Sequence, residues 1–303
     1  MKLILFLVLG ILTAAYILFW IASVRRTRRQ DAERLQPASA VVPDVWQILT
    51  GFVTNFLDAL GVGSFATTAS IYKLRGMVPD EMLPGTLNVG HALPVIAQAF
   101  IYISLIEVDP ITLATLIAAA VVGAWIGAPV VARWPRRTIQ IGLGSVLIVF
   151  ACLMMMSQLD LLPIGGDSLA LKGALLATGI FGSFWLGALM TLGLGFYAPC
   201  MILISMLGMN PKAAFPIMMG ACAFLMPVAS MQFVRRERYS LRPALGLTLG
   251  GIPGVLLAAY IVRSLPLGAV RWLVVVVVLY TATTLLQSAI RERRRAASEA
   301  AVD

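Results

Sequence analysis

Residues 58–66 read DALGVGSFA, and residues 190–198 read MTLGLGFYA. Both stretches carry a Gly-x-Gly pair inside a long apolar run: Gly61, Gly63, Gly193 and Gly195. The second run, residues 173–209, has 37 residues without a charge. As one helix it would be roughly 55 Å long, against about 30 Å for the hydrocarbon core of a bilayer. The chain must therefore break or turn back within it, and the glycine pair marks the place.

A shift of 132 positions superimposes the two stretches and continues beyond them. The shift pairs glycines and prolines at Gly61/Gly193, Gly63/Gly195, Gly76/Gly208, Pro79/Pro211 and Pro84/Pro216, and a one-residue slip adds Gly123/Gly254 and Pro135/Pro266. Such residues record backbone geometry, so their recurrence indicates an internal repeat rather than shared hydrophobicity. We expect five parts: an N-terminal transmembrane helix (1–24), a basic cytoplasmic linker (25–45), two transmembrane repeats (46–158 and 173–290) and a cytoplasmic tail (291–303).

Composition places this chain in a lipid bilayer. It is 60% hydrophobic and 12% charged, about half the charge of an average soluble domain. The net charge of +9 comes from short basic clusters between apolar runs, which is typical of cytoplasmic loops and excludes a nucleic-acid partner. Residues 3–24 carry no charge and exceed a signal-peptide core in length, so we expect a retained helix.

The positions of the basic residues favour hairpins at both glycine pairs. If every apolar segment crosses once, 14 Lys and Arg lie inside and 9 outside. If each Gly-x-Gly segment returns to its side of entry, 18 lie inside and 5 outside, as the positive-inside rule prefers. Each repeat then holds one re-entrant hairpin and three crossings, so the second copy is inverted. The predicted fold is an all-α integral membrane protein with two inverted repeats, its N-terminus periplasmic and its C-terminus cytoplasmic.

The sequence resembles the TauE/SafE sulfite exporter family. The resemblance rests on the repeated Gly-x-Gly break, on the turns GMVP (76–79) and GMNP (208–211), and on the stretches 58–66 and 84–88, and it covers nearly the whole chain beyond the first helix. It implies a permease of the bacterial inner membrane for small anions, often sulfur oxyanions or organosulfonates. The fuller family pattern has a third glycine, where this chain has Ser64 and Phe196, and a proline, where it has Thr67 opposite Pro199.

The two hairpins are the predicted substrate site. A helix broken in lipid needs a polar cavity, and half-helix N-termini offer free N–H groups to an anion. Two such ends from opposite hairpins would face one small anionic substrate. The candidate substrate-binding residues are Gly61, Gly63, Ser64, Thr67, Thr68, Asn88, Gly193, Gly195, Tyr197, Pro199 and Cys200. The alternative is that the glycines only permit close helix packing.

Two ionisable residues are candidates for proton coupling. Asp58 is the one acid well inside an apolar segment, and its counterpart in the second copy is Met190. Such acids mark ion or proton pathways, although Asp58 could instead cap or pair helices. His91, the only histidine, lies one helical turn after Asn88 and could relay protons or bond a neighbouring backbone, and Gln98 could line the path or join helices.

No cofactor, metal site or enzymatic activity is predicted. Walker A, HExxH and nucleophile–base patterns are absent from the sequence. Fourteen methionines with Cys152, Cys200 and Cys222 leave a soft-metal transporter as an alternative, but their spacing is irregular and suits core packing better. The leading hypothesis is a secondary active transporter of a small anion; a channel and a non-catalytic membrane assembly factor remain open. Homo-oligomerisation, the coupling ion and the direction of transport also stay open.

Overall fold

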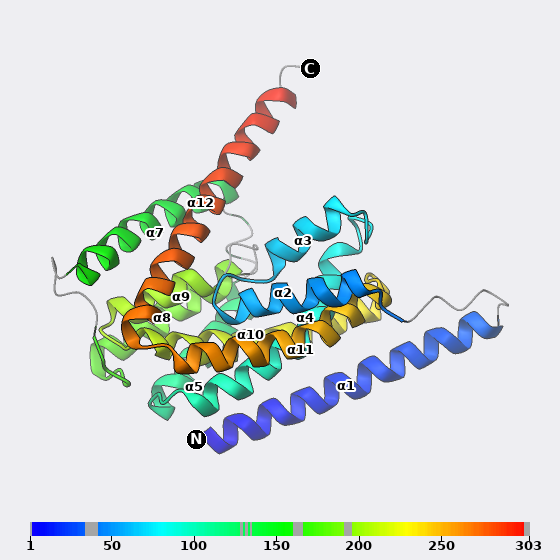
Figure 1. Ribbon diagram of the computed structural model, residues 1–303, viewed down its shortest axis with the longest axis horizontal. Helices are drawn as coiled ribbons and strands as arrows, with labels where there is room; N and C mark the ends of the chain where they lie inside the picture. Colours follow the sequence, from blue (N-terminus) through cyan, green and yellow to red (C-terminus); the bar gives the residue numbers. More distant parts are fainter. Residues whose placement is uncertain are drawn as a thin grey trace. The chain divides into compact units, whose positions relative to one another are not determined.

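The computed structural model describes residues 2–33, 42–127, 130, 133, 135–159, 166–190 and 196–299. Within these residues the protein is all-helical, with eleven α-helices, one π-helix, one 3₁₀-helix and no β-sheet (Figure 1). The α-helices are α1 (Lys2–Glu33), α2 (Val45–Ala59), α3 (Phe65–Leu74), α4 (Leu83–Leu105), α5 (Pro110–Val122), α7 (Arg136–Gln158), α8 (Gly173–Met190), α9 (Tyr197–Met206), α10 (Ala214–Arg235), α11 (Leu241–Ser264) and α12 (Leu267–Glu299). The π-helix Gly123–Gly127 continues α5.

Eight helices in the described part of the chain are long and apolar enough to cross a bilayer. They are α1, α4, α5 with its π-helical extension, α7, α8, α10, α11 and α12. The predicted all-α, multi-pass character is confirmed. α2, α3 and α9 fall outside this set, and α3 and α9 have 10 residues each, about 15 Å of helix.

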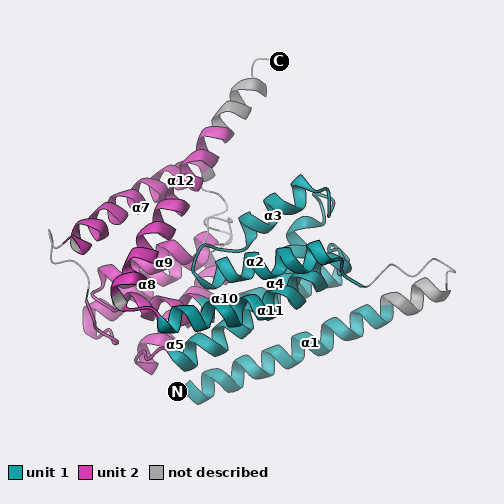
Figure 2. Ribbon diagram, viewed as in Figure 1, with its two compact units in different colours: residues 1–105, 219–264 teal, residues 106–218, 265–303 magenta. Residues whose placement is uncertain are grey.

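The chain forms two compact units (Figure 2). Unit 1 contains residues 1–105 and 219–264, and unit 2 contains residues 106–218 and 265–303. Each unit therefore combines helices from both predicted repeats. Inversion of the second repeat and a shared substrate site remain predictions.

In unit 1, α2 and α3 form a hairpin whose two ends lie together. α2 crosses the view of Figure 1 from right to left, and α3 returns toward the right. The guanidinium of Arg75, just after α3, lies 3.8 Å from the centre of the Trp46 ring at the start of α2. The end of α3 thus lies beside the start of α2.

Glycine conformation ends α2 and turns the chain. Gly61 has φ +96°, and the N–H of Val62 bonds the carbonyl of Leu57 at 3.1 Å while the N–H of Gly61 bonds that of Asp58 at 2.8 Å. This pair of bonds is a Schellman closure, which needs a left-handed residue just past the helix. Gly63, with φ +88°, then redirects the chain into α3. A side chain at either position would strain the backbone.

Unit 1 is held by close contact of α2 and α4 with α11. A Cβ at Gly250 would collide with the backbone of Ile48 in α2. Pro94 in α4 has no N–H, so the carbonyl of Gly90 loses its helical partner. The Thr248 hydroxyl of α11 donates to that carbonyl at 2.9 Å. The carbonyl that Pro94 leaves without a helical partner in α4 is thus hydrogen-bonded by a threonine of α11.

In unit 2, the long apolar run is interrupted as predicted. α8 ends at Met190 and α9 begins at Tyr197, so residues 173–209 do not form one helix. Gly193 and Gly195, the predicted point of the break, lie outside the described residues. At the start of α5, Asp109 accepts the N–H of Thr112 at 2.8 Å, and this bond lowers the pKa of the carboxyl.

Equivalent contacts in the two units support the internal repeat. A Cβ at Gly123 would collide with the backbone of Phe184, and a Cβ at Gly254 would collide with that of Phe52. The 132-residue shift pairs Phe52 with Phe184. The turns after α3 and α9 also match, because Gly76 and Gly208 both have positive φ and close Schellman turns. In each unit the first hairpin helix of one repeat packs on a helix of the other repeat.

Both terminal helices extend beyond the predicted membrane segments. α1 continues from the predicted span through Arg25 to Glu33, and α12 continues through Arg291 to Glu299. Part of the predicted linker and of the predicted tail is therefore helical. α1 is fixed to unit 1 by a narrow buried stripe, Leu9, Tyr16 and Trp20. Its Trp20 indole donates to the Tyr239 hydroxyl at 3.2 Å.

We expect Lys73→Cys and Arg236→Cys to be labelled from the same side of the membrane. Lys73, in the last turn of α3, pairs with Asp80 in the connection to α4 at 3.1 Å. The N–H of Ser240, in the turn that carries Arg236, donates to the hydroxyl of Thr86 in the first turn of α4 at 2.9 Å. Membrane-impermeant maleimide, applied to right-side-out and inverted vesicles in a cysteine-free background, measures this. Ser104→Cys, near the other end of α4, should be labelled from the opposite side. Labelling of positions 73 and 236 from opposite sides would show that this arrangement is wrong.

Candidate functional site

The turn between α2 and α3 is built around the buried carboxylate of Asp58. Only 2% of Asp58 is exposed. Its Oδ1 accepts the N–H of Ser64 at 2.7 Å, and its Oδ2 accepts the side-chain amide of Gln98 in α4 at 2.9 Å. Asp58 thus bridges the turn and pairs α2 with α4, which are the two structural roles left open by the sequence. Its proton-coupling role remains a prediction.

The N-terminus of α3 lies beside this carboxylate. Ser64 is the N-cap residue, and its side chain makes no capping hydrogen bond. The first intrahelical bond runs from the N–H of Thr68 to the carbonyl of Ser64, so the three preceding amides have no acceptor within the helix. A Cβ built on Gly63 would meet no atom within 4 Å. This end of α3 therefore combines outward N–H groups with open space.

Thr67 lies in the first turn of α3. It is half-buried, and its hydroxyl donates to the carbonyl of Ser64 at 2.8 Å. The oxygen lone pairs of such a hydroxyl remain acceptors, and its proton can be redirected to a ligand. Thr67 is therefore placed beside the amides at the start of α3, and its role in substrate binding remains a prediction.

His91 joins three helices through side-chain contacts rather than bonding a neighbouring backbone. Its Nδ1 lies 2.9 Å from Asn55 Oδ1 in α2, and its Nε2 lies 3.0 Å from the Thr68 hydroxyl in α3. The Asn55 amide nitrogen donates to Gly51 O, which leaves Oδ1 as an acceptor and assigns the proton to Nδ1 of a neutral ring. Asn88 instead donates to Pro84 O at 2.9 Å. His91 and Thr68 thus fix α3 against α4, and the hydrogen bond of Asn88 stays within α4.

The candidates of the second hairpin lie in unit 2. Tyr197, Pro199 and Cys200 occupy the first turn of α9, and all three are buried. Phe196, the N-cap residue of α9, has the same helical backbone conformation as Ser64 before α3. The two half-helices therefore begin alike, although the described residues place no acidic counterpart of Asp58 in the second.

Two residues that bond the candidate site were not predicted from the sequence, Asn55 and Tyr102. Asn55 lies one turn before Asp58 and so shares its helix face, a signal that was available. Tyr102 donates from its hydroxyl to the carbonyl of Ala59 at 2.8 Å and thereby holds the end of α2. No sequence signal indicated Tyr102, because its role depends on how α4 is rotated against α2.

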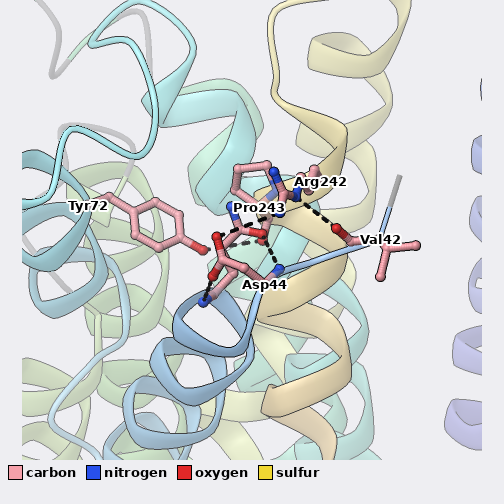
Figure 3. A network of polar contacts seen from close by, with 6 residues as sticks. Val42, Asp44, Tyr72, Arg242 and Pro243 are labelled. Carbon is pink, nitrogen blue, oxygen red and sulfur yellow. Dashed lines mark hydrogen bonds and ion pairs between the residues drawn. The ribbon is translucent and has the colours of Figure 1, made fainter. Parts of the chain in front are cut away.

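A polar network closes the base of the hairpin (Figure 3). Asp44 caps α2 through the N–H of Gln47 at 2.8 Å. Arg242, at the start of α11, donates to the carbonyl of Val42 at 2.7 Å and lies 4.0 Å from the Asp44 carboxylate. The Tyr72 hydroxyl of α3 donates to Pro243 O at 3.2 Å. Both arms of the hairpin are thus tied to the same end of α11.

We expect Thr68→Val to lower the free energy of unfolding by about 1–3 kcal/mol, because it leaves His91 Nε2 buried without its partner. Thr67→Val is the matched control, since that hydroxyl donates to the carbonyls of Gly63 and Ser64, just before its own helix, and not to another helix. Unfolding of both variants in mixed detergent micelles measures the difference. Equal stability of the two variants would contradict the assigned role of His91.

These features define a class: a multi-pass helical membrane protein with a broken hairpin and a buried carboxylate at its turn. Comparison with protein families matches residues 1–154 to the family described as Sulfite exporter TauE/SafE. The match spans α1 and the first repeat, rather than nearly the whole chain. Comparison with curated proteins and with solved structures gives no match. The chain belongs to the TauE/SafE sulfite exporter family and is a membrane transporter, not an enzyme.

Proposed function

We propose that this protein is a secondary carrier of a small anion, a sulfur oxyanion or an organosulfonate or carboxylate. The observation that carries the proposal is the α2–α3 hairpin, whose turn places α3 amides beside open space at Gly63. A helix N-terminus combines free N–H donors with partial positive charge, and oxyanions bind there. The substrate anion is bound at the first turn of α3, with the hydroxyl of Thr67 as an additional ligand.

The hairpin dips into the bilayer and leaves on its side of entry. The contact between Arg75 and Trp46 supports this, because it brings the two ends of the hairpin to one level. In lipid, backbone groups freed by a helix break are tolerated only around a protein-lined or watery cavity. The break is therefore part of the transport path, and the second hairpin, by the internal repeat, supplies an inverted counterpart.

Asp58 couples anion movement to protons. It is buried at the hairpin turn, where an ionised acid is costly in a membrane and marks ion or proton pathways. The excess of Lys and Arg in one set of loops supports a cytoplasmic C-terminus and a periplasmic N-terminus in a bacterial inner membrane.

Purified protein in proteoliposomes tests the proposal. Labelled sulfite, sulfate, methanesulfonate and acetate are offered with and without a pH gradient. We expect saturable flux of one or more of these anions, driven uphill by the gradient. Flux without saturation, and without accumulation against a concentration gradient, would indicate a channel. Flux of Cu(I) with none of the four anions would indicate the soft-metal alternative.

A further inference from the structure

The anion-binding end of α3 already holds an anion that belongs to the protein. The Asp58 carboxylate accepts the N–H of Ser64, the N-cap residue of α3, at 2.7 Å. A negative charge at this position is stabilised by the helix dipole, as a substrate anion would be. Two anions at one helix end repel each other and compete for the same positive potential. Bound substrate and ionised Asp58 therefore disfavour each other.

The buried side-chain amide of Gln98 can accept a hydrogen bond from Asp58 when Asp58 is protonated. Gln98 is fully buried, and its nitrogen donates to Asp58 Oδ2 at 2.9 Å. Within the part of the chain that the structure describes, Gln98 Oε1 has no hydrogen-bond partner. A buried acceptor without a hydrogen bond lowers the stability of the folded protein by about 1–3 kcal/mol, so a donor that reached it would be favourable. Oε1 belongs to the same amide that touches the carboxylate, so a donor at Asp58 would be within its reach.

Proton uptake supplies that donor. A proton from water that binds Oδ2 converts the carboxylate from an acceptor into an O–H donor. Rotation of the Gln98 amide by half a turn then exchanges its nitrogen and oxygen, and Oε1 accepts the new O–H. The carboxyl is neutral in this arrangement and no longer opposes a second anion at the α3 N-terminus.

We infer that Asp58 is an internal competitor of the substrate anion at the α3 N-terminus, and that protonation, with Gln98 Oε1 accepting the new O–H, neutralises it and ends the competition. One proton then enters the site with one anion, and the proton leaves to water when the anion leaves. This inference rests on the proposed function, because it requires that the anion bind at α3. It adds to the proposed function a physical reason for coupling: the anion binds at α3 when Asp58 carries a proton.

The other titratable and charged groups near α2 do not offer the same exchange. On α4, Tyr102 bonds the carbonyl of Ala59 and His91 is held by Asn55 and Thr68. On α3, Tyr72 bonds Pro243 O and Lys73 pairs with Asp80 at 3.1 Å, at the other end of the helix. On α11, Arg242 lies beside Asp44, and Tyr260 and Arg263 are exposed.

Binding of sulfate and methanesulfonate as a function of pH tests the inference. Both anions keep their charge between about pH 5 and pH 8, so any pH dependence belongs to the protein. Wild-type affinity should rise by up to about tenfold per unit fall in pH, as one linked proton requires. Asp58→Asn should bind with the low-pH affinity of the wild type at every pH. Asp80→Asn, which removes an exposed carboxylate from the same half of the chain, should keep the wild-type pH dependence.

Gln98→Met provides a second readout if Asp58→Asn does not fold. It removes the charge-assisted bond to the ionised carboxylate, so the pH of half-maximal binding should move upward. An Asp58→Asn protein that keeps the wild-type pH dependence would overturn the inference, as would a Gln98→Met protein with an unchanged midpoint. If the wild type binds neither anion, the inference fails, whereas the proposed function fails only if the proteoliposome panel also shows no anion flux.

Discussion

Asp58→Asn is expected to abolish accumulation of the anion against its gradient when only a pH difference drives transport. The wild type should reach roughly tenfold accumulation per pH unit if one proton accompanies one anion, because each unit is worth about 1.4 kcal/mol. The variant has no carboxylate to carry the proton, so its accumulation ratio should stay near one. Uptake of the best-transported anion into proteoliposomes with an imposed pH difference measures the ratio.

The control for this experiment is Asp80→Asn, which should leave pH-driven accumulation unchanged. Asp80 is exposed and pairs with Lys73, so Asp80→Asn removes the same charge without touching the hairpin turn. Both variants are compared by size-exclusion profile and helical content before the assay. Full pH-driven accumulation by a folded Asp58→Asn protein would remove Asp58 from the coupling mechanism.

Valine at either Gly123 or Gly254 is expected to destabilise the protein by roughly 3 kcal/mol or more. In both positions a Cβ would overlap the backbone of the facing helix, at Phe184 and at Phe52, and a backbone cannot move aside as a side chain can. Because the two contacts are equivalent under the internal repeat, the two variants should lose similar stability. The yield of monodisperse protein and the unfolding temperature in detergent measure the loss.

Gly142→Val is the matched control. Gly142 is an exposed helical glycine in α7, and an added Cβ there would meet nothing within 4 Å. It should therefore retain wild-type stability. A large difference between Gly123→Val and Gly254→Val would show that the two contacts are not equivalent, and tolerance of both would show that the helices are not so closely packed.

The helical break at Gly61 and Gly63 and the turns after α3 and α9 could be predicted because glycine and proline are tied to particular backbone conformations. Gly61 and Gly63 have positive φ, and Gly76 and Gly208 close matching turns, as their spacing in the sequence indicated. The length of residues 173–209 against the thickness of a bilayer was enough to require the interruption between α8 and α9.

The partners within the site could not be predicted with the same success. Which side chains of α2 and α3 bond His91 depends on the rotation of α4 against those two helices, and the face that His91 shares with Asn88 within α4 does not settle it. The close packing of Gly250 against Ile48 likewise requires knowing which helix lies opposite. α1 and α12 end later than the predicted membrane segments. Charged residues such as Arg25 and Arg291 are good helix formers and continue each helix beyond its apolar span.

Protection of a cysteine in the first turn of α3 tests most directly whether the substrate binds there. Thr67→Cys is prepared in a background in which Cys152, Cys200 and Cys222 are alanine, with Ser70→Cys, exposed one turn further along α3, as the reference. We predict that the anion transported best in proteoliposomes slows maleimide labelling at position 67 and leaves labelling at position 70 unchanged. Labelling at position 67 that stays the same at saturating anion would contradict the proposed site.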